Sequence, residues 1–160
     1  MNTNNQKGFT LLEVLLVVAA IAILAGIVIV ALNPAKQLGD TRNAQRRSDV
    51  ATILNAVHQY AIDNAGNLPT GIDSVTATSQ VLGTALTGCD ATCTATTTVV
   101  ACVDLATELV PTYVVGIPFD PTSGESDGTN SEYYINRDAN GRITVGACDP
   151  EQSETISVTR

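Results

Sequence analysis

The sequence predicts an α+β fold in which one long N-terminal helix packs on a small antiparallel β-sheet head. Three observations lead to this prediction. An uncharged apolar run covers residues 14–32, an amphipathic helical pattern follows over residues 35–65, and short alternating segments separated by turn residues fill the C-terminal part. The first half of the helix is therefore expected in a membrane, and the second half is expected to cover the sheet.

The apolar run is long enough to cross a bilayer. Its nineteen uncharged residues reach roughly 29 Å at about 1.5 Å per helical residue, which is the thickness of the hydrocarbon layer. Glu13 stands immediately before the run. An ionised carboxylate at this edge costs on the order of a few kcal/mol in lipid unless it finds a partner. The sequence therefore predicts a membrane helix with one functional acid near its start.

The residues around this acid form a specific motif. Lys7 and Gly8 are followed by Phe9, and Glu13 stands at the fifth position after the glycine. The motif resembles the processing signature of type IV prepilins and pseudopilins. The resemblance implies a leader of residues 1–8, cleavage between Gly8 and Phe9 by a membrane-embedded prepilin peptidase, and N-methylation of Phe9. It also implies that Glu13 pairs with the Phe9 amine of a neighbouring subunit when the helices stack into a filament.

Two other interpretations of the N-terminus remain open. A secretory signal peptide has a similar order of charge and apolar residues, but its apolar part is normally shorter and lacks an acid near its start. A plain signal anchor would stay unprocessed. The mass of the mature N-terminus separates these cases, because pilin processing gives a start at Phe9 and signal peptidase gives one near Lys36.

The orientation of the span rests on two opposing signals. Four basic residues follow the span, and the positive-inside rule alone would place the C-terminal part in the cytoplasm. The cysteine content and the family resemblance favour export instead. We therefore expect a single-pass protein of the inner (cytoplasmic) membrane with an exported head, which later becomes part of an extracellular filament.

The long helix is expected to contain two breakers, Gly26 and Pro34. Proline lacks the backbone N–H and clashes with the preceding turn, so a kink or local break is predicted at Pro34 and a weaker one near Gly26. The segments are then a hydrophobic helix over 9–33 and an amphipathic half over 34–66 that ends at Gly66. The apolar stripe of the second half consists of Val50, Ile53, Leu54, Val57 and Ala61.

Charge divides the rest of the chain. Residues 63–160 contain 13 acidic and 3 basic residues, so we expect no nucleic-acid binding by the head. Arg42, Arg46 and Arg47 are predicted to form one basic patch on the amphipathic helix. This patch could contact DNA or anionic lipid, or it could be a solvated or subunit-bridging face. His58, the only histidine, is expected at the boundary of the apolar stripe and not as a ligand.

The head, residues 67–160, begins with a polar region and ends with strands. Residues 70–100 are rich in Thr, Ser, Ala and Gly and predict a loop region, with a strand over 96–102. A short helix is predicted over 103–110. Strands are predicted over 132–137 and 142–148, joined by a turn at Asn140 and Gly141, with a last strand over 155–160.

The four cysteines predict two disulfide bonds in an exported head. Their spacing does not form the paired CxxC motifs of a zinc site. The sequence leaves three connectivities open. The expected pairing is Cys89 with Cys93 and Cys102 with Cys148.

An acidic loop holds the candidates for a metal site. Asp120, Glu125, Asp127 and Glu132 offer oxygen ligands of the kind that Ca²⁺ prefers, and the loop faintly resembles the calcium loop of major pseudopilins. An ordinary acidic surface loop is the alternative. A calcium-dependent shift in melting that a chelator abolishes would decide between them. No other cofactor is expected.

The predicted function is that of a structural subunit in a type IV pilus or related filament. No catalytic set with recognisable spacing occurs, so no enzymatic activity is expected. Its partners are then copies of itself, the prepilin peptidase, the pilus or secretion machinery, and the membrane. One alternative is a pseudopilin of a type II secretion system. The other is a membrane-anchored binding or adhesin protein that never polymerises.

Overall fold

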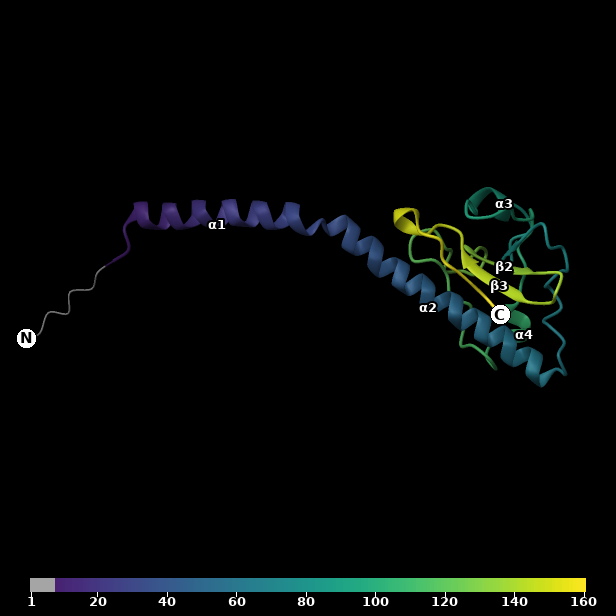
Figure 1. The fold of residues 1–160 in the computed structure, drawn as a ribbon. Helices are drawn as coiled ribbons and strands as arrows, with labels where there is room; N and C mark the ends of the chain where they lie inside the picture. Colours follow the sequence, from purple (N-terminus) through teal and green to yellow (C-terminus); the bar gives the residue numbers. More distant parts are fainter. Residues whose placement is uncertain (1–7) are drawn as a thin grey trace, which may run out of the picture. The chain divides into compact units, whose positions relative to one another are not determined.

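A computed structural model describes residues 8–160 of the chain, which fall into two compact units. The first unit ends at Leu38 and the second is Gly39–Arg160. The predicted leader, except for Gly8, lies outside the described residues. The elements, drawn in Figure 1, are the helices α1 (Leu11–Leu32), α2 (Pro34–Asp63), α3 (Cys89–Thr92), α4 (Ala106–Leu109) and η1 (Glu151–Ser153), and the strands β1 (Gln80–Val81), β2 (Tyr133–Arg137), β3 (Ile143–Ala147) and β4 (Ser157–Thr159).

Helix α1 forms from the apolar run predicted to span a membrane. It begins after Thr10, whose side-chain oxygen accepts a hydrogen bond from the backbone N–H of Glu13 at 3.3 Å and so caps the helix. Its 22 residues include none that is buried. By length and composition, the helix is able to cross a bilayer.

The long helix is interrupted at Asn33, next to the predicted breaker Pro34. Asn33 adopts a left-handed conformation with φ 41° and ψ 76°, and its side-chain oxygen accepts a hydrogen bond from the backbone N–H of Lys36. Pro34 is the first residue of α2, where a missing N–H costs nothing. By contrast, α1 runs through Gly26 without interruption, so the weaker break expected there is absent. A single glycine costs a helix only about 1 kcal/mol and removes no hydrogen bond.

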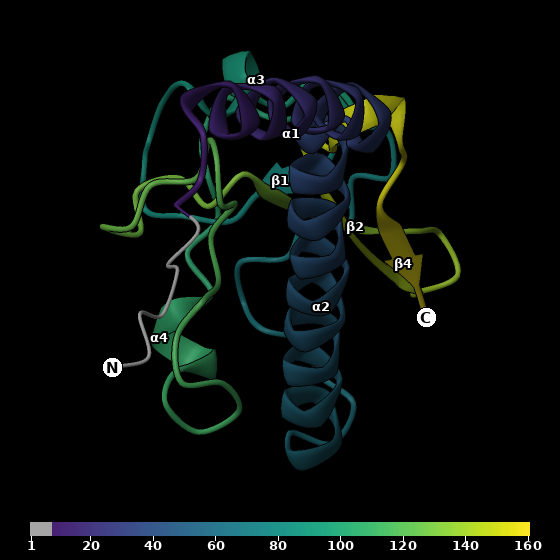
Figure 2. The same ribbon diagram turned by 90° about the vertical axis from the view of Figure 1, so that its left-hand side faces the viewer.

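Helix α2 covers one face of the sheet in the second unit, as predicted. Val50, Ile53, Leu54 and Val57 are buried and Ala61 is half-buried. The four buried residues pack against residues of the strands in one apolar core, which includes Tyr133, Ile135, Ile143 and Val145. Figure 2 shows α2 lying lengthwise along this layer. His58 is half-buried beside the stripe.

The sheet has four antiparallel strands in the order β1-β2-β3-β4. The predicted hairpin is present, because β2 and β3 pair through the turn at Asn140 and Gly141, where Gly141 has φ 83°. The predicted C-terminal strand is β4. The strand expected over 96–102 is wrong, since this stretch makes only an isolated bridge from Thr98 to Ser79. The strand on that side is the short β1.

A second, smaller apolar cluster lies on the other face of the sheet. Alternation along the strands places Tyr134 there, opposite to its neighbours Tyr133 and Ile135. Tyr134 packs with Val81 and three cysteines, and Figure 1 shows α3 on the side of the sheet away from α2. The head is therefore a three-layer arrangement in which the outer layer is held by cysteines.

Candidate processing segment and arginine ladder

The predicted cleavage site precedes α1 directly. Gly8 and Phe9 belong to no helix or strand, both are exposed, and the Phe9 side chain is 83% exposed. Irregular exposed backbone is what a peptidase needs in order to bind the scissile bond. The structure therefore leaves the bond between Gly8 and Phe9 accessible, although cleavage itself stays a prediction.

Glu13 is the third residue of α1 and lies in its first turn. A carboxylate in this position is favoured by the partial positive charge at the helix N-terminus. Its side chain is exposed, and within residues 8–160 no ion pair involves it. The Phe9 amine exists only after cleavage, so the uncleaved chain does not test the predicted pairing of Phe9 with Glu13.

The second unit contains an ion pair that the sequence analysis missed. Arg46 of α2 and Asp120 are both fully buried. The guanidinium donates two hydrogen bonds to the carboxylate, Nε to Oδ2 at 2.5 Å and Nη2 to Oδ1 at 2.9 Å. It also donates to Asn43 Oδ1 and Thr122 Oγ1. This two-pronged geometry is the strongest that an arginine and a carboxylate form.

The environment of the pair keeps both groups charged. Burial opposes ionisation of Asp120, but hydrogen bonds from Arg46 and Thr122 outweigh it and hold the pKa of this carboxyl below its ordinary value. The hydrogen bond to Asp120 raises the pKa of Arg46. Both charges are therefore matched inside the head.

Two further arginines of α2 contact the C-terminal segment. Arg42 forms an ion pair with Glu151 at 2.9 Å, and Arg47 forms one with Glu154. The hydrogen bond from Arg42 lowers the pKa of Glu151. Together Arg42, Arg46 and Arg47 form what we call the arginine ladder, which ties α2 to two loops of the head.

The approach of η1 to α2 depends on Gly39. A Cβ atom at this position would lie 2.7 Å from Glu151 Oε2 and 2.8 Å from Gln152 Nε2. Next to it, Asn43 donates to the backbone oxygen of Glu151 at 2.9 Å and accepts from its N–H at 3.0 Å. The C-terminal segment is thus held by both backbone and side chains.

These contacts correct the predicted basic patch. Arg46 is inside the protein, and Arg42 and Arg47 are neutralised by acids of the same chain. DNA and anionic lipid therefore meet no continuous positive surface here. The sequence did indicate that Arg46 is buried, because Arg46 stands four residues before Val50 and so falls on the apolar stripe itself.

A second buried contact joins α2 to the sheet. The Tyr133 hydroxyl donates a hydrogen bond to Asp49 Oδ2 at 2.8 Å. Burial and this neighbouring carboxylate raise the pKa of Tyr133, and burial also raises the pKa of Asp49. The tyrosine stays protonated and keeps its donor role.

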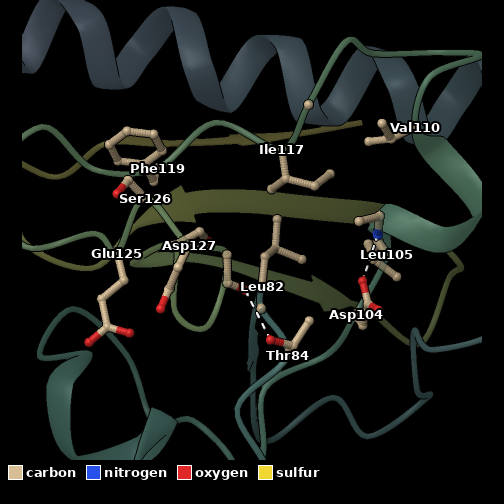
Figure 3. Close-up of a pocket in the computed structure, with 15 residues that line it drawn as sticks. Leu82, Thr84, Asp104, Leu105, Val110, Ile117, Phe119, Glu125, Ser126 and Asp127 are labelled. Atoms are coloured by element: carbon tan, nitrogen blue, oxygen red, sulfur yellow. Dashed lines mark hydrogen bonds between the residues drawn. The ribbon is translucent and has the colours of Figure 1, made fainter.

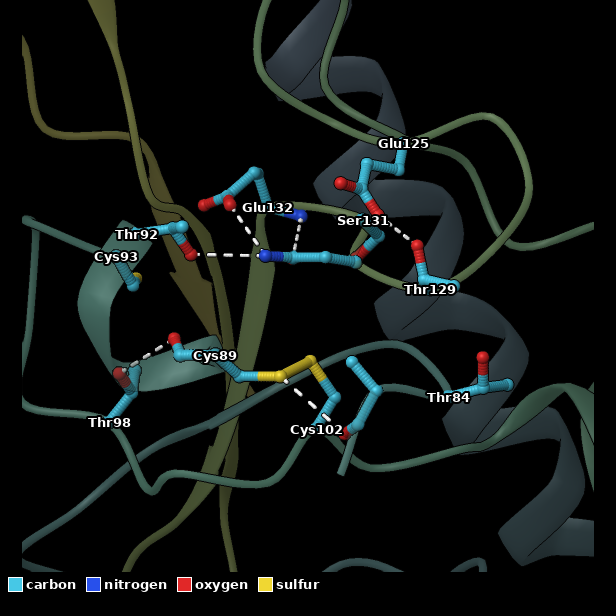
Figure 4. Close-up of a disulfide and its surroundings, with 12 residues drawn as sticks. Thr84, Cys89, Thr92, Cys93, Thr98, Cys102, Glu125, Thr129, Ser131 and Glu132 are labelled. Carbon is cyan, nitrogen blue, oxygen red and sulfur yellow. Dashed lines mark hydrogen bonds between the residues drawn. A yellow bond between two sulfur atoms is a disulfide. The ribbon is translucent and has the colours of Figure 1, made fainter. Parts of the chain in front are cut away.

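The structure contains two disulfide bonds, but their pairing differs from the prediction. Cys89 bonds to Cys102, and Cys93 bonds to Cys148; the first is shown in Figure 4. Cys89 begins α3, and Cys93 follows its last residue. Side chains one helical turn apart have Cβ atoms about 5–6 Å apart, whereas a disulfide needs about 3.8 Å. The predicted bond between Cys89 and Cys93 is therefore wrong.

The four calcium candidates do not come together. Asp120 is engaged by Arg46, and both Glu125 and Asp127 accept hydrogen bonds from Thr129 at the loop tip. No cluster of three or more potential metal ligands of the Asp, Glu, His or Cys type occurs within residues 8–160. Calcium binding by this loop stays a prediction.

Glu132 is the most unusual of these four acids. It is 2% exposed, has φ 57°, and accepts a hydrogen bond from Asn130 at its Oε1 atom. Asn130 also donates a hydrogen bond to the hydroxyl of Thr92 in α3 at 3.0 Å, and Figure 4 shows Thr92 and Glu132 near each other. The Oε2 atom is buried without a partner among the described residues. Burial raises the pKa of this carboxyl.

Comparison with known proteins identifies the N-terminal segment. Residues 3–29 match the family described as "Prokaryotic N-terminal methylation motif". The segment around Gly8 and Glu13 is of the prepilin type. The match covers the predicted cleavage site and most of α1, and it does not extend into the head.

The chain is also similar to two proteins called "Type II secretion system core protein G". It is 39% identical to the one from Escherichia coli (strain K12) over 62 residues, which is 39% of this chain and 41% of that protein. It is 39% identical to the one from Aeromonas hydrophila over 64 residues, 40% of this chain and 43% of that protein. The chain thus spans about two fifths of these relatives. No solved structure gives a significant match.

Proposed function

We propose that this chain is a structural subunit of a type IV pilus or related filament, assembled from a membrane pool after cleavage between Gly8 and Phe9. The observation that carries the proposal is the prepilin-type motif at the start of a 22-residue apolar helix without a single buried residue. Such a surface needs lipid before assembly and other helices afterwards.

The charge of Glu13 explains why one subunit would associate with another in a fixed register. Cleavage creates a cationic amine on Phe9, and methylation would preserve its charge. Inside a bundle of apolar helices, Glu13 of one subunit would be costly unless the amine of a neighbour neutralised it. The pair would then fix the axial register between subunits, and helix packing would offset the loss of lipid contact.

A secretion pseudopilus is the second candidate for the same subunit. It is favoured by the names of the two relatives, both of which are core proteins of a type II secretion system. A surface pilus would appear in sheared culture supernatant as fibres that react with an antibody against the head. A pseudopilin would instead stay with the cell envelope, and its deletion would stop the export of secreted proteins.

A structural role, without catalysis, suits the head. The buried side chains of Arg46 and Asp120 neutralise each other, and the sequence contains no catalytic set with recognisable spacing. A membrane-anchored adhesin that never polymerises is the alternative of another class, and it differs from both filament proposals because it predicts no assembly at any expression level. The proposed partners are copies of this chain, the prepilin peptidase and the assembly machinery.

The test replaces Glu13 by alanine in cells that contain the prepilin peptidase and the assembly machinery used by the native chain. We expect the E13A chain to be cleaved to a Phe9 start, as measured by mass spectrometry, and to enter the membrane, while filaments or pseudopilus bundles are lost. The matched control D90A removes an exposed acid of the head and should assemble normally. Undiminished assembly by E13A would overturn the proposed pairing, and a mature chain that retains residues 1–8 would overturn the whole proposal.

A further inference from the structure

The head contains a small cavity that neither the disulfides nor the arginine ladder explains. It has a volume of about 270 Å³ and a floor of aliphatic side chains that includes Leu82, Leu105 and Ile117. Three acids, Asp104, Glu125 and Asp127, also line it. We call it the acidic-rimmed pocket.

The two kinds of side chain occupy opposite edges of this pocket. In Figure 3, Phe119, Ile117 and Val110 lie along one edge, and Glu125, Asp127 and Asp104 lie along the other, with Leu82 between the two edges. A ligand seated here would therefore meet aliphatic surface on one side and negative charge on the other.

Local hydrogen bonds hold the acidic edge in place. Asp127 Oδ1 accepts from the backbone N–H and hydroxyl of Thr129, at 3.0 and 2.6 Å, and these bonds lower the pKa of Asp127. Glu125 accepts from the same hydroxyl, and Asp104 accepts from the N–H of Ala106 at 2.8 Å. The edge is thus fixed before any ligand arrives, which reduces the entropy cost of binding.

The size of the pocket selects the class of ligand. The pocket of about 270 Å³ lies at the lower end of the clefts of about 300–1,000 Å³ that hold small ligands, and this volume suits one anchoring side chain of a polypeptide. Apolar surface extends from its edge, because the lining residue Phe119 is 43% exposed and Val115, which precedes the lining residue Gly116, is 94% exposed. A peptide could therefore place its anchor in the pocket and rest its backbone on this surface.

Charge decides what kind of polypeptide fits. Arg42, Arg46, Arg47 and Arg142 already pair with carboxylates of their own chain, and residues 63–160 contain 13 acids against 3 bases. Two such heads repel each other. A second copy is therefore a poor complement to this edge, and a basic partner is a good one.

We propose that the acidic-rimmed pocket is a docking site for a segment of a different protein, in which an aliphatic side chain fills the pocket and a flanking lysine or arginine contacts the acidic edge. This proposal goes beyond filament assembly and does not require it.

The proposal is tested with three fluorescein-labelled peptides. They are identical except for their central residues, which are Lys-Leu-Lys, Lys-Gly-Lys or Glu-Leu-Glu. Fluorescence anisotropy is measured with the full chain in non-ionic detergent micelles at low salt, with empty micelles as blank. We expect the Lys-Leu-Lys peptide to bind about tenfold more tightly than either of the others, and added salt to weaken it.

Variants locate the binding. E125Q combined with D127N should weaken binding of the Lys-Leu-Lys peptide by roughly threefold to tenfold, since each exposed ion pair contributes only modestly in water. The matched control, D63N with D90N, removes two exposed acids away from the pocket and should leave binding unchanged. F119S should weaken the Lys-Leu-Lys peptide and leave the Lys-Gly-Lys peptide unaffected.

Several results would overturn the proposal. The Glu-Leu-Glu peptide could bind as tightly as the Lys-Leu-Lys peptide, or the Lys-Leu-Lys peptide could fail to bind up to millimolar concentration. The control variant D63N with D90N could also weaken binding as much as E125Q with D127N does. Self-association of the chain that is lost in E125Q with D127N would make a second copy the occupant instead. Amide shifts at Gly116 and Gly128, measured on labelled full chain, report whether a bound peptide lies at the pocket.

Discussion

The two units of this protein satisfy their apolar and charged groups in opposite ways. The first unit leaves every residue of α1 exposed and carries Glu13 without an ion-pair partner among the described residues. The second unit buries its apolar stripe and encloses Arg46 and Asp120 together. Helix α1 therefore needs surroundings that its own chain does not supply, whereas the head is complete by itself.

The contrast is clearest in the two acids, Glu13 and Asp120. Each is placed where an unpaired carboxylate is costly, one at the edge of a lipid-length helix and the other inside a packed core. Asp120 has its cation within the same chain. Glu13 has none among residues 8–160, and we propose it as a mark for assembly for this reason.

The largest predicted effect on the head comes from breaking the buried ion pair. D120A leaves the Arg46 guanidinium buried without its counter-charge, and we expect a loss of about 3–5 kcal/mol in the free energy of unfolding. Urea unfolding of the full chain in micelles, followed by near-UV circular dichroism, measures this loss.

A double variant checks the cause. R46M with D120L removes both charges and should recover most of the lost stability. If D120A cost less than about 1 kcal/mol, the ion pair would not hold α2 to the head. The second unit would then not depend on internal charge pairing, which is the property that distinguishes it from the first unit.

The next effect concerns the disulfides. Replacing Cys93 and Cys148 by serine opens a loop with a sequence separation of 55, and replacing Cys89 and Cys102 opens one of 13. Loop entropy predicts losses of about 4 and about 3 kcal/mol respectively. Peptide mapping of the unreduced protein checks the pairing first, and a fragment that joins Cys89 to Cys93 would contradict the structure.

A smaller, pH-dependent effect is expected at Glu132. Burial raises the pKa of this carboxyl in the folded state, so its contribution to stability is fully present below its unfolded pKa, about 4.3, and is lost as pH rises through the folded pKa. E132Q should therefore match the native chain in acid and exceed it at pH 8 by on the order of 1 kcal/mol. Identical pH profiles of the melting temperature would show that the carboxyl is not destabilised by burial.

The smallest effect is expected in α1. I21A removes an exposed aliphatic side chain and should change the unfolding free energy of the head by less than about 0.5 kcal/mol. The matched change I53A, in the core, should cost about 2–5 kcal/mol. Comparable losses in the two variants would mean that α1 contributes to the stability of the head.

Local sequence was sufficient for much of the head. The stripe from Val50 to Val57 fixed which face of α2 is buried, and Asn140 with Gly141 fixed the hairpin and thereby the register of β2 and β3. These features depend on residues close in the chain, and periodicity and turn chemistry report them directly. The same is true of the motif at Gly8 and Glu13.

Tertiary structure alone decided which distant groups meet. The position of Arg46 on the apolar stripe can be read from the sequence, but its pairing with Asp120 depends on the return of a loop 74 positions away. The cysteine pairing likewise depended on where the end of β3 lies against α3. Sequence by itself determined an apolar helix with an acid at its start and the hairpin of β2 and β3, because those are set by near neighbours. The partners of buried charges and thiols are set by contacts across 13 to 74 positions, which no local pattern encodes.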